Sequence, residues 1–422
     1  MQKDRYLDEY GIIQSFPEYE MVSGKGNTFV RNMYKGIDVG KGGFVYSEPG
    51  MYRNVALLDV SSMHPHSIIA MNYFGEFTKN YKDLVDARVA IKHEDYDTLK
   101  TLLEGKLEKY THDKDILKTL DKVLKYPINA AYGETAASFP NRFRDERNIN
   151  NIVALRGALF MVDLKEEVEK RGFVVAHIKT DSIKIPEATP EIISFVQDFA
   201  RKYGYEMEHE ATYDRICLVN NSVYIAKYDD KGIRNKGGVH ADEWTATGAE
   251  FQHPYIFKTL FSHEPIEFKD YCETKTVKDS AMYLDMNKDL IRDTFNEYKE
   301  IIEQISNWPK GVPGVMNLKR KAKLLDEEMA SVHNLVFVGK CGSFCPMDDT
   351  VDAGILVRTN IVNGETTYAS VSGTKGYRWL ETEDVIRKGL QDHLDISYYR
   401  KLIDSAKDHL SDFCDVDEFI NG

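Results

Sequence analysis

The sequence predicts an α+β fold, because strand-like and helix-like patterns fall in separate stretches of the chain. Two apolar runs, Val55–Val60 and Ile216–Ala226, read as strands, and residues 174–186 read as a β-hairpin of two short apolar runs around a polar turn. Residues 81–132 and 150–171 instead repeat their apolar positions at helical spacing. The chain is therefore expected to combine a sheet, part of it a hairpin, with long helices.

Composition places the chain among folded proteins. With 422 residues, 42% of them hydrophobic, it is long enough for one large multi-lobed unit or for two to three ordinary domains. No apolar run approaches bilayer length and the N-terminus is polar, so we expect a soluble protein that is not exported. Five cysteines without zinc-finger spacing predict reduced thiols, with neither disulfides nor structural zinc.

Net charge bears on what the chain can bind. The formal charge of −13 speaks against a nucleic-acid-binding protein and implies modest non-specific affinity for DNA. Basic clusters at residues 142–147, 231–236 and 319–323 favour the opposite conclusion. Because such clusters are more often solvated surface than binding sites, they only support an assignment made on other grounds.

The strand at Val55–Val60 carries an acid near its end. Its almost continuous apolar run reads as a buried central strand that delivers Asp59 at the C-terminal edge, and a helix can begin near Pro65. Buried acids are rare unless they are paired or bind a metal, which makes Asp59 a candidate ligand. The alternative is that Asp59 caps the helix that follows.

The hairpin at residues 174–186 presents a second acid, Asp181, in its turn. A Thr-Asp-Ser tripeptide alone is more often an ordinary surface turn than a functional site. Considered with Asp59, however, it suggests a specific chemistry. Acids from adjacent strands can hold two Mg²⁺ ions about 3.5–4 Å apart and clamp an in-line phosphoryl transfer.

Two helical segments present cations along one face. Arg88 and Lys92 lie four residues apart, and Lys125 shares a helix face with Asn129 and Tyr132. Such faces suit a ligand with several phosphates, because Arg binds them as a fork and Lys as a point charge. The alternative is a solvated amphipathic pair of helices.

The remaining elements are expected as follows. Pro127 lies within the second cationic segment, so we expect a kink there or a helix that begins near Tyr126. From about residue 246 the pattern predicts helices, followed by a β-like region around Leu335–Asn363 and a closing pair of helices.

Three motifs, in order along the chain, resemble those of family B DNA polymerases of the bacteriophage type. Residues 59–68 (DVSSMHPHSI) are similar to the family's Dx2SLYPS motif, residues 125–133 (KYPINAAYG) to Kx3NSxYG, and residues 177–182 (HIKTDS) to YxDTDS. Residues 42–45 (GGFV) resemble the glycine turn that precedes the polymerase core and touches the template. The resemblance runs from about residue 36 to beyond residue 240 and implies template-directed, primer-dependent synthesis of DNA from dNTPs.

The resemblance also implies a role for each matched position. It implies two Mg²⁺ ions, with Mn²⁺ as a substitute, held by Asp59, Asp181 and the Val60 carbonyl, and a catalytic set of the two acids with Lys125. The implied nucleotide-binding residues are Ser62, Met63, His64, Arg88, Lys92, Lys125, Asn129 and Tyr132. The implied DNA-binding residues are Gly42, Gly43, Gly133, Lys179, Thr180, Tyr224, Lys236 and Gly237.

Three positions depart from the family pattern. Lys179 stands where the family has its first Asp, and a lysine that pointed inward would weaken metal binding, so we expect it to point at primer phosphate. His64 replaces the tyrosine that excludes the ribose 2′-hydroxyl, which puts sugar discrimination in doubt. Residues 221–224 (NSVY) stand where the family often has Lys-Lys-Arg-Tyr, which predicts a weak grip on DNA.

A right-hand architecture follows from the resemblance, with an antiparallel-sheet palm, helical fingers and a mixed thumb. The expected parts are an N-terminal extension at 1–39, palm at 40–80 and 134–245, fingers at 81–133, and thumb with the C-terminal region at 246–422. Only 58 residues precede Asp59, so we expect no exonuclease domain in this chain. A separately encoded exonuclease subunit and truncation of a longer polymerase are both open, as is a processivity factor.

The expected partners are primer–template DNA and dNTPs, with no membrane, in the cytoplasm of a bacterial host and in phage genome replication. The alternative function is a catalytically quiet polymerase-like subunit that binds DNA or another protein. Asp59, Asp181 and the helical cations favour the enzyme, whereas Lys179 favours the alternative.

Overall fold

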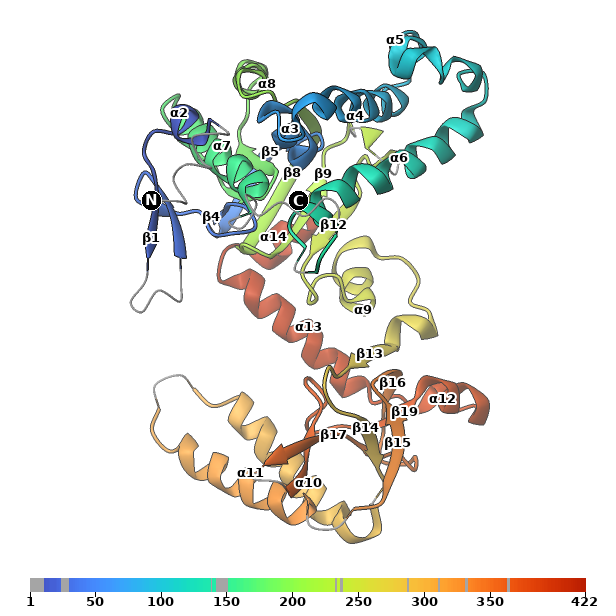
Figure 1. Ribbon diagram of the computed structural model, residues 1–422. Coiled ribbons are helices and arrows are strands. Elements are labelled where there is room, and N and C mark those ends of the chain that lie inside the picture. Colours follow the sequence, from blue (N-terminus) through green and yellow to red (C-terminus); the bar gives the residue numbers. More distant parts are fainter. Residues whose placement is uncertain are drawn as a thin grey trace. The chain divides into compact units, whose positions relative to one another are not determined.

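The chain divides into two compact units, which are described separately. The computed structural model describes residues 11–23, 30–137, 139–141, 151–231, 234–235, 238–286, 288–309, 312–330, 333–362 and 365–422. The first unit comprises Met1–Gly248 with Phe413–Phe419, and the second comprises Ala249–Asp412 with Ile420–Gly422 (Figure 1). Every strand pair in the described residues is antiparallel.

A seven-stranded sheet forms the centre of the first unit, in the order β12-β9-β8-β5-β7-β6-β4. Its strands are β4 (Val45–Ser47), β5 (Gly50–Val60), β6 (His177–Lys179), β7 (Ser182–Pro186), β8 (Met207–Asn220), β9 (Val223–Tyr228) and β12 (Trp244–Thr247). The predicted central strand is confirmed, because β5 lies fourth of the seven. The predicted hairpin is also confirmed as β6 and β7.

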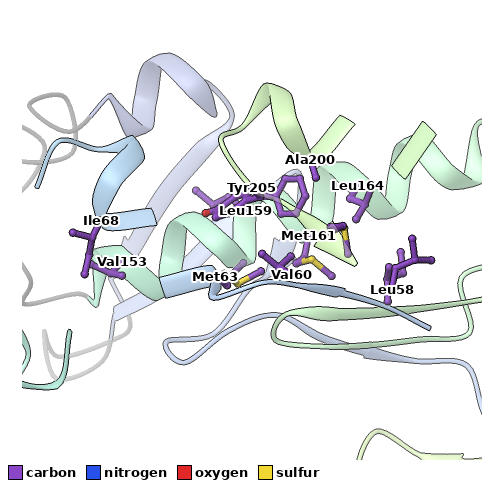
Figure 2. Packing of buried hydrophobic residues seen from close by; sticks show 14 of the residues in the cluster. Leu58, Val60, Met63, Ile68, Val153, Leu159, Met161, Leu164, Ala200 and Tyr205 are labelled. Carbon is purple, nitrogen blue, oxygen red and sulfur yellow. The ribbon is translucent and has the colours of Figure 1, made fainter. Parts of the chain in front are cut away.

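Helices cover one face of this sheet. Leu58 and Val60 of β5 are buried with residues of α7 (Ile152–Glu169), and α7 also contacts α3 (Met63–Ala70) and α8 (Pro190–Lys202). Figure 2 shows Leu58, Val60 and Met63 packed with Leu159, Met161 and Leu164. Because strand side chains alternate, this apolar packing directs Asp59 to the other face.

Two long helices of the first unit are joined at one end through a shorter helix (Figure 1) and contact each other. They are α4 (Thr78–Lys92) and α6 (Lys114–Thr135), joined through α5 (Tyr96–Thr101) and the short 3₁₀ turns η2 (Leu102–Gly105) and η3 (Glu108–Tyr110). Asp113 begins α6 by accepting hydrogen bonds from the backbone of Asp115 and Ile116, each at 3.0 Å.

A small sheet near the start of the chain packs on α7. It contains β1 (Tyr19–Ser23), β2 (Val30–Tyr34) and β3 (Ile37–Asp38), and α2 (Ile12–Ser15) precedes it. The Tyr34 hydroxyl donates to buried Asp163 of α7 at 2.8 Å, and Lys35 pairs with the same carboxylate at 2.9 Å. Asp163 is therefore buried with partners, as a charged group in a core must be. The remaining elements of this unit are η1 (Gly75–Phe77), β10 (Arg234–Asn235), β11 (Gly238–Val239) and α14 (Val416–Asn421), whose last residues fall to the second unit.

The second unit contains two sheets, β13-β16-β19 and β15-β14-β17-β18. Its strands are β13 (Glu273–Thr276), β14 (Met282–Asp285), β15 (Leu335–Gly339), β16 (Cys341–Met347), β17 (Ile355–Val362), β18 (Glu365–Ser370) and β19 (Arg378–Glu381). Its helical elements are α9 (Pro254–Phe257), η5 (Lys258–Ser262), η6 (Phe268–Tyr271), α10 (Lys288–Ser306), α11 (Val315–Ala330), α12 (Thr382–Lys388), η7 (Gln391–His393) and α13 (Ile396–Ser411).

Two local predictions were wrong, and one of the two alternatives at Pro127 is excluded. The single strand expected over Ile216–Ala226 is two strands, β8 and β9, joined at Asn221 and Ser222. Of the two alternatives at Pro127, a helix that begins near Tyr126 is excluded, because α6 begins at Lys114 and runs through Pro127, whose side chain is exposed; the kink stays a prediction. The helical stretch expected from about residue 246 contains strands β13 and β14. No described helix is both long enough and apolar enough to cross a membrane.

Candidate functional site

The two candidate acids come from adjacent strands of the central sheet. The backbone N–H of Val60 donates to the carbonyl oxygen of Asp181 at 2.8 Å, and Asp59 pairs across strands with Ser182. Both acids are half-buried. The end of β5 is thus tied to the turn of the β6–β7 hairpin, so both carboxylates belong to the same edge of the sheet.

The glycine segment predicted to touch DNA packs against this hairpin turn. The Thr180 N–H donates to the carbonyl of Phe44 at 2.9 Å. Gly43 has a φ of +132°, and a Cβ placed on it would lie 2.8 Å from the Thr180 methyl carbon. A Cβ on Gly42 would meet nothing within 4 Å. Packing on Thr180 and backbone conformation therefore give Gly43 a structural reason to be glycine, independent of DNA.

Lys179 shares a sheet face with Asp59. Directly paired residues of antiparallel strands lie on the same face, and Ser182 pairs with both Asp59 and Lys179. The Lys179 side chain is exposed. Lys179, which departs from the family pattern, therefore lies on the same face as Asp59 but is open to solvent, as contact with a phosphate would require.

The ring of His64 contacts helix α6 and lies within electrostatic reach of Asp181. Its centroid is 4.4 Å from that of Tyr132, whose hydroxyl donates to Asn151 at 2.8 Å. Burial lowers the pKa of His64, while the Asp181 carboxylate acts in the opposite direction. The structure thus brings His64, Tyr132 and Asp181 together, with His64 neutral at pH 7.

The residues just before His64 are held by the backbone and by the core. Ser62 adopts a positive φ of 57° at the start of α3. Met63 is buried against α7, and a Cβ on Gly157 would lie 2.4 Å from its sulfur atom. The Met63 side chain is therefore a core group, which leaves its backbone as the part that a nucleotide could contact.

The predicted phosphate-binding cations of α4 are engaged with carboxylates. The Arg88 Nε lies 3.2 Å from Asp121 of α6, and the Lys92 Nζ lies 3.7 Å from Glu208 of β8. Burial alone would raise the pKa of Glu208, but Lys92, Ser61 and His93 together lower it overall. Both cations would have to exchange a carboxylate for a phosphate before they could bind a nucleotide.

The other predicted contacts on α6 are open to solvent. Lys125, Asn129 and Gly133 are exposed, and a Cβ on Gly133 would meet nothing within 4 Å. A cavity of about 860 Å³ is lined by residues of α3, α4, α8 and β8, among them Glu208, and by Ser61 and His93 just outside these elements. None of the predicted nucleotide-binding residues lines this cavity.

The remaining predicted DNA contacts lie on or beyond β9. Tyr224 is half-buried, and its ring lies 4.8 Å from the Nζ of Lys184. Burial would raise the pKa of Tyr224, but Lys184 and its hydrogen bonds lower it overall. Lys236 and Gly237 lie outside the described residues.

The donor set at the strand ends suits a hard divalent cation. Two carboxylates and a backbone carbonyl are oxygen ligands, which Mg²⁺ takes alongside water and substrate phosphate oxygens. Within the described ranges, no group of three or more His, Cys, Asp or Glu side chains could hold a metal by itself. Asp59, Asp181 and Val60 therefore fit a metal that also binds substrate rather than a closed all-protein site.

Three polar residues near Asp59 were missed by the sequence analysis. Lys184 is 3% exposed and His177 is 1% exposed, and both lie on the Asp59 face of the sheet. Glu208 pairs with Asp59 across β5 and β8. For Lys184 the sequence did contain a signal. Side chains alternate along a strand, so Lys184 lies on the same face as Ser182, two residues before it in β7.

Comparison with known proteins gives a distant relationship. No family model matches the chain. A DNA polymerase 2 of Saccharolobus solfataricus is 24% identical over 292 residues, which are 67% of this chain and 43% of that protein. The family B DNA polymerase of Pyrobaculum calidifontis aligns with a TM-score of 0.40 and 14% identity, over 91% of this chain and 48% of that chain. The chain thus spans less than half the length of either protein.

Proposed function

We propose that this chain is a template-directed, primer-dependent DNA polymerase that adds dNTPs to a primer 3′-hydroxyl. One observation carries the proposal: Asp59 and Asp181 lie at the same edge of the sheet. The Val60 N–H, next to Asp59, donates a hydrogen bond to the Asp181 carbonyl at 2.8 Å. The 24% identity to a DNA polymerase over 67% of the chain supports it. The reaction is a nucleotidyl transfer, in which the primer 3′-hydroxyl attacks the α-phosphate of the dNTP and pyrophosphate leaves.

Asp59, Asp181 and the Val60 carbonyl would hold two Mg²⁺ ions, for which Mn²⁺ could substitute. The ions would supply charge stabilisation for the transferring phosphoryl group and activate the 3′-hydroxyl. The chain's own residues position the reactants. The hairpin fixes Asp181 against β5, and such fixed geometry is the main contribution of protein to this kind of chemistry.

The nucleotide would lie between the sheet edge and the helices α4 and α6. Lys125 and Asn129 are exposed on one face of α6, and Tyr132 stands beside His64. The triphosphate would draw Arg88 from Asp121, because several phosphate oxygens offer the guanidinium more acceptors than one carboxylate. His64 would occupy the position facing the sugar, where it sets selectivity between ribose and deoxyribose.

In this proposal the first unit contains the palm, at 40–80 and 134–245, and the fingers, at 81–133. Residues 246–422 form the thumb and C-terminal region, and residues 1–39 an N-terminal extension. Primer–template DNA would contact Gly42, Gly43, Gly133, Lys179, Thr180, Tyr224, Lys236 and Gly237. Phage genome replication in a bacterial host, with an exonuclease subunit or processivity factor supplied separately, remains part of the proposal.

A primer-extension assay tests this function. The purified chain is given a primer–template, Mg²⁺ and either one templated dNTP or one mismatched dNTP. The proposal predicts extension by one nucleotide only with the templated dNTP. Extension without a template would contradict template direction, and absence of extension with both Mg²⁺ and Mn²⁺ would contradict the enzyme.

A catalytically quiet polymerase-like subunit is the second candidate. The pairing of Arg88 with Asp121 and of Lys92 with Glu208 favours it, because these pairs neutralise two of the three predicted phosphate-binding cations. Lys179 adds a positive charge beside the acids. Binding of primer–template in a gel-shift assay by a chain that extends no primer would identify this function.

A further inference from the structure

Lys184 is a buried cation in the middle of the central sheet. It is 3% exposed and lies between Ile183 and Ile185 of β7, both of them fully buried in the core on the other face. Lysine is almost never buried without a partner. Its burial therefore calls for groups that compensate the charge.

A histidine provides the first of these groups. The Nζ of Lys184 lies 3.1 Å from Nδ1 of His177, and Nε2 of His177 lies 3.1 Å from the carbonyl oxygen of Asn221. A carbonyl only accepts, so Nε2 carries the hydrogen and Nδ1 holds the lone pair that accepts from Lys184. Burial lowers the pKa of His177 to about 4, and Lys184 acts in the same direction. His177 is thus a neutral acceptor for Lys184.

Aromatic and acidic groups complete the surroundings. The ring of Tyr224 lies 4.8 Å from Nζ, within the range of a cation–π contact. Lys184 pairs with Leu57, two residues before Asp59 on the same strand and face. Diagonal neighbours of this kind lie about 7–8 Å apart, within reach of a long side chain. Burial lowers the pKa of Lys184 and Lys179 acts in the same direction, whereas Tyr224, Asp59 and Glu210 favour its charged form.

We propose that Lys184 is a built-in counter-charge to Asp59, which weakens the affinity of that carboxylate for divalent metal ions. This inference rests on the proposed function, in which Asp59 is a metal ligand. His177 and Tyr224 hold the Lys184 ammonium in place on the sheet face that carries Asp59. The consequence is a higher requirement for divalent metal than the two acids alone would impose.

The size of the effect follows from electrostatics. A buried ammonium at this separation repels a divalent ion bound at Asp59, and the low local dielectric leaves that repulsion poorly screened. Replacing Lys184 with methionine removes the charge and keeps an unbranched apolar side chain of similar length. We expect the dissociation constant for Mn²⁺ to fall about tenfold or more.

Direct binding of Mn²⁺ to the full chain, followed by electron paramagnetic resonance without DNA or dNTP, tests the inference. Lys184→Met should bind Mn²⁺ at least about tenfold more tightly than the wild type, and Lys184→Arg should bind as the wild type does. Lys227→Met is the matched control. Lys227 lies on the same sheet but neighbours buried Ala226 in the alternation of β9, on the face opposite Tyr224. Its removal should leave the affinity unchanged.

Two outcomes separate the inference from the proposed function. Unchanged Mn²⁺ affinity in a folded Lys184→Met chain overturns the inference and leaves the polymerase proposal intact. Mn²⁺ binding that survives Asp59→Asn overturns the assignment of Asp59 as a ligand, and the inference with it. If Lys184→Met is unfolded because His177 loses its donor, the double variant Lys184→Met, His177→Phe removes both partners and serves the same test.

Discussion

Substitution of Gly43 by alanine tests how the hairpin that carries Asp181 is held. The residue has a φ of +132°, and its new Cβ would lie 2.8 Å from the Thr180 methyl carbon and 3.1 Å from the Thr180 hydroxyl oxygen. Thr180 directly precedes Asp181 and itself has a φ of 59°. The alanine must therefore displace the turn on which the candidate carboxylate stands.

Two costs add in this variant. A non-glycine residue at positive φ costs about 1–2 kcal/mol, and overpacking of a close contact costs about 1–3 kcal/mol. We therefore expect Gly43→Ala to lower the free energy of unfolding by about 2–5 kcal/mol. For a unit of this size the melting temperature should fall on the order of 5–10 °C.

Thermal unfolding and single-nucleotide incorporation measure the two consequences of the Gly43→Ala substitution. We expect kcat to fall by about tenfold or more, because a misplacement of about 1 Å at a reacting group is costly. Gly42→Ala is the matched control, since a Cβ there meets nothing within 4 Å. Equal effects of the two substitutions would refute the packing argument. Loss of DNA affinity by Gly43→Ala at unchanged stability would instead favour a DNA contact.

Three further predictions follow from the site. Burial lowers the pKa of His177 to about 4, so between about pH 6.5 and pH 4 the histidine is protonated in the unfolded chain but not in the folded chain. Urea unfolding at a series of pH values should therefore show that the free energy of unfolding falls by about 3 kcal/mol across this range. This fall should be absent in His177→Phe. Arg88→Ala should raise KM for dNTPs by about tenfold, and Asp121→Asn should lower it, because Asp121 competes with phosphate for Arg88. KM values of both variants equal to that of the wild type in steady-state kinetics would contradict this competition. His64→Tyr should raise the ratio of kcat/KM for deoxyribonucleotides over ribonucleotides by about tenfold, because a larger ring fills the space of the 2′-hydroxyl, and an unchanged ratio would remove His64 from the sugar site.

Local patterns predicted the elements that carry the candidate site. The strand at Val55–Val60 and the hairpin around Asp181 follow from apolar runs and a turn, which are properties of neighbouring residues. The strand predicted over Ile216–Ala226 was wrong because the turn at Asn221 and Ser222 is short and lies between two Val- and Ile-containing runs. A periodicity reading alone does not detect so short an interruption.

Partners that are distant in the sequence could not be predicted. Asp121 is separated from Arg88 by 33 positions, and only the packing of α4 on α6 brings them together. Lys184 in the run Ile183–Ile185 reads as a solvent-facing strand residue, yet His177 and Tyr224 cover it. The local sequence pattern indicates on which face of the sheet a residue lies. The residues that cover that face depend on tertiary packing.

The central claim is that Asp59 and Asp181 together perform templated nucleotidyl transfer. Rapid-quench measurement of single-nucleotide incorporation, with Mg²⁺ and saturating primer–template, tests it through Asp181→Asn. Asp198→Asn is the control, an exposed acid on α8 that pairs with Arg201. The proposal predicts at least about a thousandfold loss of rate in Asp181→Asn at unchanged DNA affinity, and a wild-type rate in Asp198→Asn. Incorporation by Asp181→Asn at the wild-type rate would contradict it.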